Sequence, residues 1–129
     1  MRLLLDTNIL IPVIHETFDD IPQRLREAVQ RQDQSLHASV ASLWEIAIKV
    51  RLKKLALKVP LSALPDLFEG LNMAQLTIEA AHVLVALDQE PETRDPFDRL
   101  LLAQCQVEGL RLVTTDRVLA AHPLAWRPA

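Results

Sequence analysis

The chain has few residues of the kinds that mark secreted, disulfide-bonded or membrane proteins. Its 129 residues include one cysteine, Cys105, which cannot form an internal disulfide. Because Cys105 lies in an apolar helical stretch, we expect a buried thiol in a reducing compartment. No apolar run approaches the about 18 residues of a membrane span, and the N-terminal residues lead at once into a short apolar strand instead of a signal segment. These features predict a cytoplasmic protein that does not enter a membrane.

Aromatic residues and excess positive charge are also scarce. The chain has no tyrosine, 4% aromatic residues and a formal net charge of −3. A protein that holds nucleic acid by bulk charge alone is therefore excluded, and base stacking beside the basic residues is not indicated. Trp44 and Trp126 are expected to be core or interface anchors. The four histidines stand singly along the chain, so they form no zinc-binding pattern with the single cysteine.

The chain consists of short apolar runs that alternate with segments of helical, amphipathic periodicity. Half of its residues are hydrophobic, and we expect residues 1–129 to form a single domain. Short apolar runs predict strands, and amphipathic spacing predicts helices between them. The expected strands are 3–5, 36–38, 73–76, 110–113 and a terminal strand around 124–126; the expected helices are 19–29, 40–50, 61–70, 77–85, 97–108 and a short one after 116. This alternation predicts an α/β fold, a three-layer α/β/α sandwich with a short central parallel sheet of four to five strands.

Local signals place several helix ends. Ser39 and Thr77 are expected to be N-caps, and Pro96 suits the first position of its helix. Gly109 is expected to end that helix in the left-handed conformation.

Four acidic residues bound or interrupt the apolar segments. We call them the acidic quartet: Asp6, Glu45, Asp98 and Asp116. Ligands of open α/β sheets bind at the carboxyl edge of the strands, where these side chains could meet. Like charges so close together need cations to remain ionised, and carboxylate oxygens suit Mg²⁺ or Mn²⁺. The acidic quartet is therefore a candidate site for one or two divalent ions.

Each acid also has a purely structural interpretation. Asp6, Asp95 and Asp116 all stand where a helix begins, and an aspartate there can do no more than cap the helix. Glu45 is different because it lies in mid-helix, where no cap is needed. The joint pattern favours a site over four unrelated caps.

The motifs that carry these acids resemble a known family. They are Leu-Leu-Asp-Thr-Asn at 4–8, Ser-Leu-Trp-Glu-Ile-Ala-Ile-Lys at 42–49, Arg-Asp-Pro-Phe-Asp-Arg-Leu-Leu-Leu-Ala-Gln at 94–104 and Leu-Val-Thr-Thr-Asp at 112–116. In order and spacing they are similar to the motifs of PIN-domain ribonucleases, and more narrowly to the toxins of VapBC-type toxin–antitoxin pairs. The resemblance implies a PIN-like fold, with the acidic quartet as the catalytic, metal-binding residues and Asp95 as an accessory acid or cap. It also implies hydrolysis of RNA phosphodiester bonds by a Mg²⁺- or Mn²⁺-activated water, and a cognate antitoxin partner.

Further residues are candidates for supporting roles. Thr7, Asn8 and Thr115 could orient a ligand or the scissile phosphate, although local capping explains them equally well. The candidates for binding RNA are the basic residues Lys49, Arg51, Lys53, Lys54, Lys58 and Arg99. The alternative for those after Glu45 is a solvated helix end.

One position departs from the resemblance. Similar sequences often have a glycine after the Glu45 helix, where this chain has Lys53 and Lys54, so the form of that helix end is open. The apolar content of residues 18–29 and 61–71 exceeds what one small core needs, which favours a homodimer face or a groove for a partner segment.

Two other functions fit parts of the pattern. Asp6 after the first strand could be the nucleophile of a phosphoaspartyl enzyme, haloacid-dehalogenase-like or receiver-like, but such a phosphatase needs a second aspartate at the position of Asn8. Alternatively, the acids could all be caps in a non-catalytic module that binds a partner; Glu45 is the feature against this interpretation.

Overall fold

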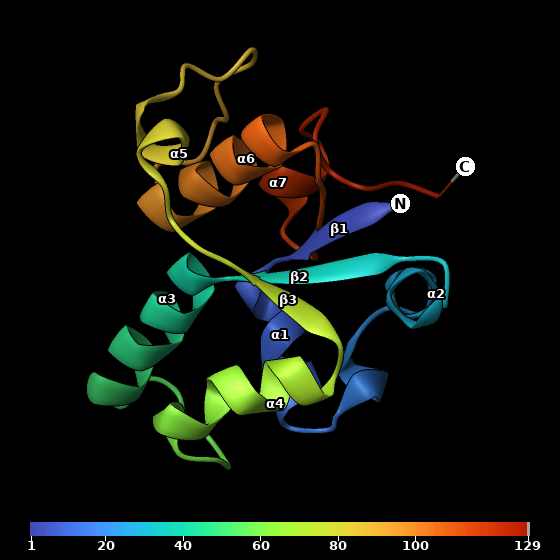
Figure 1. The fold of residues 1–129 in the computed structure, drawn as a ribbon, viewed down its shortest axis with the longest axis vertical. Helices are drawn as coiled ribbons and strands as arrows, with labels where there is room; N and C mark the ends of the chain where they lie inside the picture. The colour runs from blue at the N-terminus through green and yellow to red at the C-terminus, as the bar shows by residue number, and fades with distance from the viewer. Residues whose placement is uncertain (129) are drawn as a thin grey trace.

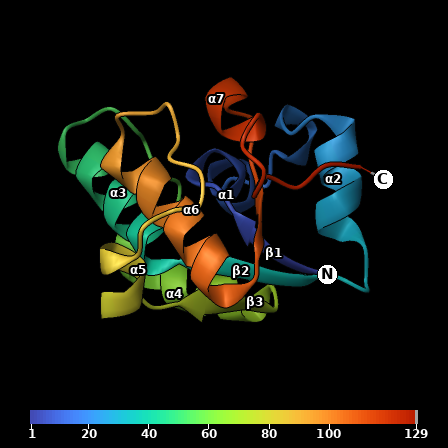
Figure 2. The same cartoon turned by 90° about the horizontal axis from the view of Figure 1, so that it is seen from above.

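A central parallel sheet organises the molecule. The computed structural model describes residues 1–128, and its four strands lie in the order β3-β2-β1-β4 with every neighbouring pair parallel (Figure 1). The strands are β1 (Arg2–Leu5), β2 (Ser35–Ser39), β3 (Met73–Leu76) and β4 (Arg111–Val113). Helices cover both faces of the sheet, as Figures 1 and 2 show. The predicted three-layer α/β/α sandwich is thus confirmed.

The helices divide into two layers. Those of the first layer are α1 (Thr7–Ile14), α2 (Gln23–Gln30), α3 (Val40–Arg51) and α4 (Leu64–Gly70), with short 3₁₀ turns at Phe18–Asp20 and Leu61–Ala63. Those of the second are α5 (Ala80–Leu84), α6 (Pro96–Glu108) and α7 (Arg117–Ala120). Figure 1 shows the second layer above the sheet and the first below it. Within the described part of the chain, no helix combines the length and apolar character needed to cross a membrane.

Side-chain alternation along the strands builds two apolar cores. Leu3 and Leu5 of β1 face the core beneath α1, α2 and α4, whereas Leu4 faces the core beneath α6. Strand β4 divides in the same way, with Val113 on the first side and Leu112 on the second. Strands buried on both faces read as continuous apolar runs, which is why residues 3–5 were recognisable from the sequence. Cys105 is buried in the second core, and this burial raises the pKa of its thiol to about 12.

Most predicted helix ends are confirmed. Ser39 caps α3 by accepting a hydrogen bond from the Ala41 amide at 3.0 Å. Pro96 is the first residue of α6, and Gly109 ends that helix with φ of 70°. Thr77 is not a cap, however. Helix α5 starts later, with Glu79 as its N-cap. The Thr77 hydroxyl donates to Oε1 of Glu79 at 2.6 Å and does not cap the helix.

The expected terminal strand is wrong. Only Ala125 pairs with the sheet, as an isolated bridge to Leu112. The Ala125 amide donates to the His122 carbonyl at 3.0 Å, which closes a turn, and Pro123 has no amide to offer a ladder. The sheet therefore has the lower of the two predicted strand numbers.

The end of α3 resolves the question raised by the missing glycine. Lys53 itself adopts the left-handed conformation, with φ of 57°. Its amide donates to the Val50 carbonyl at 3.1 Å, and the Lys54 amide donates to the Lys49 carbonyl at 2.8 Å. The chain thus makes the turn that a glycine would make, at the conformational cost of a side chain in this region.

The apolar residues expected to form a partner face lie mostly in the core. In residues 18–29 and 61–71 the buried ones include Ile21, Leu25, Val29, Leu64 and Phe68. Leu71, at the end of the second segment, is exposed, and other large exposed apolar side chains lie on or beside α3 and α5: Trp44, Leu52, Val83 and Leu84. The two helices lie at the same end of the molecule in both views (Figures 1 and 2). The two predicted segments therefore offer less exposed apolar surface than expected, and their part in an interface stays a prediction.

Candidate metal centre

The acidic quartet gathers around the switch point of the sheet. Strand β1 is flanked by β2 on one side and by the last strand, β4, on the other. In open α/β sheets the crevice at such a reversal of strand order is where ligands bind. Asp6 follows β1, and Asp116 lies three residues after β4. The Asp6 amide donates to the Val113 carbonyl at 2.9 Å, which extends the β1–β4 pairing up to the first acid.

Asp6 is the buried centre of the group. Its Oδ1 accepts a hydrogen bond from the Thr7 amide at 2.8 Å and so caps α1, while its Oδ2 accepts one from the Thr114 hydroxyl at 2.6 Å. Burial raises the pKa of Asp6 against these two stabilising bonds, and the charges of Glu45 and Asp116 raise it further. The charge that this carboxylate bears is therefore destabilised by its surroundings.

Glu45 is held on α3 by two neighbours. Its Oε1 accepts a hydrogen bond from the Thr7 hydroxyl at 2.8 Å, and its Oε2 lies 3.1 Å from Nζ of Lys49, one helical turn further on. The Thr7 hydroxyl also lies 2.9 Å from that of Ser42. Thr7, which Ser42 contacts in turn, and Lys49 thus hold a mid-helix carboxylate next to the residue that follows Asp6.

Asp98 reaches the group from α6. Its Oδ2 accepts a hydrogen bond from the Thr93 hydroxyl at 3.2 Å. Burial raises the pKa of Asp98 to about 7, with further contributions from the negative charges of Asp95, Asp6 and Asp116. Asp98 therefore shares one electrostatic environment with two other members of the acidic quartet.

Asp95 and Asp116 both cap helices. Oδ1 of Asp95 accepts from the Phe97 amide at 2.8 Å, and Oδ1 of Asp116 accepts from the amides of Val118 and Leu119 at 2.9 and 3.1 Å. The capping roles considered for Asp6, Asp95 and Asp116 are thus real. They engage Oδ1 in each case, and a carboxylate has a second oxygen with which to bind a cation.

The donor chemistry of the site fits a hard divalent cation, although its side chains are not closed around one. In residues 1–128 no group of three or more acidic, histidine or cysteine side chains is arranged closely enough to hold a metal ion as it stands. Ion pairs in the same range involve Glu45, but none involves Asp6, Asp98 or Asp116. Oxygen donors that lack a counter-ion and repel one another are what Mg²⁺ or Mn²⁺ would stabilise, after rotation of the side chains.

The accessory candidates differ in their placement. Thr7 is buried and contacts Glu45, whereas Asn8 and Thr115 are exposed. The threonine whose hydroxyl contacts Asp6 is Thr114, which sequence reasoning missed. The contact follows from the register of β1 and β4. Leu5 pairs with Val113, so the next residues, Asp6 and Thr114, lie opposite each other. That register is a tertiary property and cannot be read from the sequence.

The basic candidates are also unequal. Lys49 belongs to the site through Glu45. Arg51, Lys53, Lys54 and Lys58 are exposed and lie at or beyond the end of α3. Arg99 binds Glu90 through two hydrogen bonds of 3.2 and 3.0 Å and donates to the Val85 carbonyl at 3.2 Å, so its guanidinium holds a loop against α6.

An aromatic pair lies beside two of the acids. The rings of Trp44 and Phe97 meet edge to face at 5.3 Å, and each residue directly precedes a member of the acidic quartet. Trp44 is 57% exposed, so it is not the core anchor that was one of its two expected roles. An exposed aromatic surface therefore does exist near the site, even though the sequence did not indicate one.

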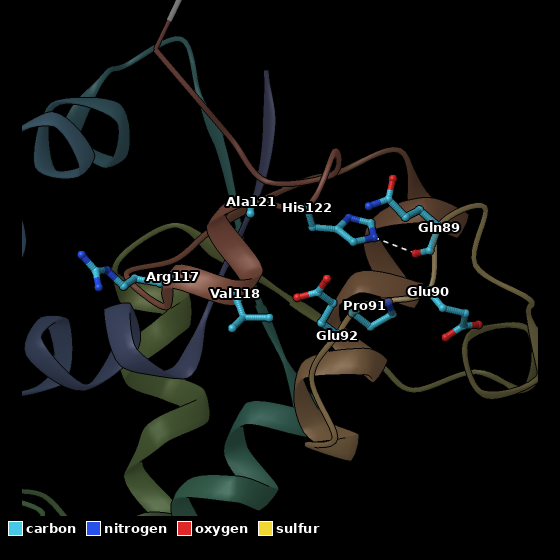
Figure 3. Close-up of a pocket in the computed structure, with 8 residues that line it drawn as sticks. All are labelled: Gln89, Glu90, Pro91, Glu92, Arg117, Val118, Ala121 and His122. Carbon is cyan, nitrogen blue, oxygen red and sulfur yellow. Dashed lines mark hydrogen bonds between the residues drawn. The ribbon is translucent and has the colours of Figure 1, made fainter.

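A pocket of about 310 Å³ lies between the loop at 89–92 and α7, as Figure 3 shows. Residues 89–92 line one wall and residues of α7 and its end line the other, including Val118 and His122. Nε2 of His122 lies 2.8 Å from the Gln89 carbonyl, which ties the walls together (Figure 3). Arg117 extends away from Glu92 across α7 (Figure 3). No member of the acidic quartet lines this pocket, although its lining residue Arg117 directly follows Asp116 in the chain.

A parallel α/β sheet with helices on both faces and carboxylates at its switch point defines the class as an open α/β domain with a site at the strand ends. The model of the PIN domain family matches residues 3–123, and the chain belongs to this family. The predicted resemblance is thereby confirmed.

Two known proteins illustrate the similarity. Ribonuclease VapC22 of Mycobacterium tuberculosis (strain ATCC 25618 / H37Rv) is 35% identical in an alignment of 106 residues that covers 78% of this chain and 80% of that protein. A crystal structure of VapBC2 from Rickettsia felis, bound to a DNA fragment from their promoter, contains a chain that matches with a TM-score of 0.66. This match covers 97% of the present chain and 96% of the other at 19% identity, so it supports the fold alone.

Proposed function

We propose that this protein is a divalent-metal-dependent endoribonuclease and the toxin of a type II toxin–antitoxin pair, acting on RNA in the cytoplasm. Membership of the PIN family and the similarity to a VapC ribonuclease support a toxin ribonuclease. The observation that carries the metal dependence is the electrostatics of Asp6. This buried carboxylate has no cationic partner among the described residues and is destabilised by Glu45 and Asp116. A divalent cation would reverse that repulsion.

We assign the residues of the site to two roles, holding the cation and positioning the residues that hold it. The acidic quartet would hold the cation, with Thr114 orienting Asp6 and Thr7 orienting Glu45. Asp95 fixes the first turn of α6 and so positions Asp98. When bound, Mg²⁺ or Mn²⁺ supplies activation of a water and stabilisation of charge on the phosphate, so no histidine base is needed.

One alternative retains a specific observation in its favour. Three of the acids do cap helices, as a non-catalytic binding module would require. Glu45 still argues against it, because a mid-helix carboxylate that is only 14% exposed serves no cap. A phosphoaspartyl enzyme is disfavoured because Asn8 is exposed and lacks the acidic group that such chemistry needs.

The proposed partners are RNA, a cognate antitoxin and a second copy of the chain. An acidic crevice attracts a basic residue of an antitoxin, which would compete with the metal. For the homodimer, the exposed apolar residues of α5 offer the surface: Leu84 is 81% exposed and Val83 is 53% exposed.

The activity is tested with structured RNA. The wild type and an Asp6→Asn variant are incubated with several RNAs in Mg²⁺, in Mn²⁺ or in EDTA. We expect cleavage by the wild type only with metal, and a loss of at least about a hundredfold in the variant. Cleavage should survive a deoxyribose at the scissile position, because water and not the 2′-hydroxyl attacks. Equal cutting in EDTA would contradict the metal, and no cutting of any RNA under any condition would contradict the ribonuclease.

A further inference from the structure

Glu45 differs from the rest of the acidic quartet in already having a cation. Nζ of Lys49 lies 3.1 Å from Oε2 of Glu45, and the two residues are one turn apart on α3. The Thr7 hydroxyl occupies the other oxygen, Oε1, at 2.8 Å. Both oxygens of this acid are therefore engaged by groups of the protein itself.

The pair is placed where it affects the site. The side chain of Glu45 is only 14% exposed and that of Lys49 is 36% exposed, so water screens their attraction less than it would on an open surface. Glu45 in turn acts on the charge of Asp6. A cation at Glu45 thus lowers the negative potential of the whole centre, including the members that have no partner.

A lysine is suited to a counter-ion that must release the Glu45 carboxylate. An ammonium on a flexible four-carbon stem makes a single-point contact, whereas an arginine would grip a carboxylate at two points. The pair is also local to one helix, so releasing it requires rotation of one side chain and no movement of the backbone. Among residues 1–128 no three acidic, histidine or cysteine side chains are arranged to hold a metal ion. This agrees with a Glu45 whose carboxylate is bound by Lys49 and Thr7 instead.

We propose that Lys49 is the built-in counter-ion of Glu45 in the metal-free protein, and that a divalent cation must displace it to bind. The proposal rests on the metal dependence proposed above. Lys49 therefore stabilises the empty centre and weakens its affinity for metal, which makes it a positioning residue and a brake on metal binding.

The first test measures Mn²⁺ binding to the full chain by isothermal titration calorimetry after EDTA treatment and dialysis. The variants are Lys49→Met, which keeps the aliphatic stem, Lys49→Arg, which keeps the charge, and Lys58→Met, which removes an exposed charge without touching Glu45. We expect Lys49→Met to bind Mn²⁺ about three- to fivefold more tightly, which is the upper end of the range for a partly screened ion pair. Lys58→Met should stay within about twofold of the wild type. Lys49→Arg should bind Mn²⁺ no more tightly than the wild type, because an arginine keeps the counter-ion and can hold Glu45 at two points.

The results separate this proposal from the proposed function. If the wild type binds no Mn²⁺, both the proposed metal dependence and the counter-ion role of Lys49 are refuted. If the wild type binds Mn²⁺ and Lys49→Met binds with unchanged or weaker affinity, only the counter-ion role falls. The same is true if Lys58→Met tightens binding as much as Lys49→Met does, because the effect would then be long-range charge.

Thermal unfolding supplies a second readout. In EDTA, Lys49→Met should melt below the wild type, because Glu45 loses its partner. Saturating Mn²⁺ should close or reverse that gap, because the metal replaces the lysine and binds the variant more tightly. An equal deficit with and without Mn²⁺ would show a purely structural role and would overturn the proposal.

Discussion

The Thr114 hydroxyl donates a hydrogen bond of 2.6 Å to Oδ2 of Asp6, and this bond joins the ends of two neighbouring parallel strands. The same hydroxyl oxygen accepts from the Asp116 amide at 3.0 Å. One threonine thereby contacts two members of the acidic quartet. It orients the buried carboxylate and opposes the rise in the pKa of Asp6 that burial causes.

Replacing Thr114 should therefore damage both stability and metal binding. Thr114→Val keeps the shape of the side chain but removes the donor and the acceptor, and we expect a loss of about 1–2 kcal/mol in the free energy of unfolding. Mn²⁺ affinity should fall because Asp6 is less well oriented. Chemical denaturation and calorimetry measure the two effects.

Thr115→Val is the matched control, because Thr115 is adjacent and exposed. It should change the free energy of unfolding by less than about 0.5 kcal/mol. Equal effects of the two substitutions would show that contact with Asp6 is unimportant.

The raised pKa of Asp98 predicts how metal-free stability depends on pH. The folded protein holds this proton up to about pH 7, whereas the unfolded chain releases it near the ordinary value of 3.8. Because the folded state binds more protons in this window, stability should fall as the pH rises from about 4 to 7. Because Asp98 is partly exposed and solvent screens its charge, we expect this loss in the free energy of unfolding to be only about 1 kcal/mol.

Asp98→Asn isolates this contribution, because it removes the titrating group. Urea denaturation in EDTA between pH 4.5 and 8 should give a smaller decline for the variant than for the wild type. Mn²⁺ affinity of the wild type should rise through about pH 7 as the proton leaves, since ligands must be deprotonated. Parallel stability curves for the two proteins would contradict this account.

The backbone at the end of α3 is in a conformation that disfavours a side chain, and a substitution to glycine can relieve this strain. Lys53 adopts φ of 57°, where a side chain is disfavoured and glycine is not. Lys53→Gly should raise the free energy of unfolding by about 0.5–1 kcal/mol, after allowance for the greater freedom of glycine in the unfolded chain. Lys54→Gly at the next position, whose φ is not positive, should be neutral or destabilising. If both glycines destabilise equally, Lys53 is not strained.

The dimer proposal can be tested on α5. Leu84→Glu places a charge on a side chain that is 81% exposed, so the fold should tolerate it while a homodimer should dissociate. Light scattering coupled to gel filtration should show a dimer for the wild type and a monomer for the variant. Leu71→Glu, at the end of α4, changes another exposed leucine and should leave the dimer intact. A wild-type monomer at all concentrations would refute the proposal.

Much of the fold was predictable because its signals are local. The strand at 3–5 is a buried apolar run, and Ser39, Pro96 and Gly109 mark helix ends through their own backbone chemistry. The terminal strand failed because the hydrogen bonds of Ala125 are shared with a turn, which no local pattern reveals.

The site was predictable only in part. Asp6 and Asp116 directly precede helices, Asp98 lies in the first turn of α6 and Glu45 interrupts an apolar helix, so sequence periodicity locates all four. Their partners depend on strand register and helix packing: Thr114 reaches Asp6 across two strands, and Thr7 reaches Glu45 across two helices. Such contacts join residues far apart in the chain, so they become visible only in three dimensions.

The central claim is that the acidic quartet holds a divalent cation. Its most direct test is an anomalous difference map from a crystal of the full chain grown with Mn²⁺. The account predicts a peak about 2.1 Å from a carboxylate oxygen of Asp6. At least one other member of the acidic quartet should bind the same ion, directly or through ordered water, with Nζ of Lys49 moved away from Glu45. Mn²⁺ elsewhere on the molecule, or no bound Mn²⁺ in a protein that cleaves RNA in the same buffer, would contradict it.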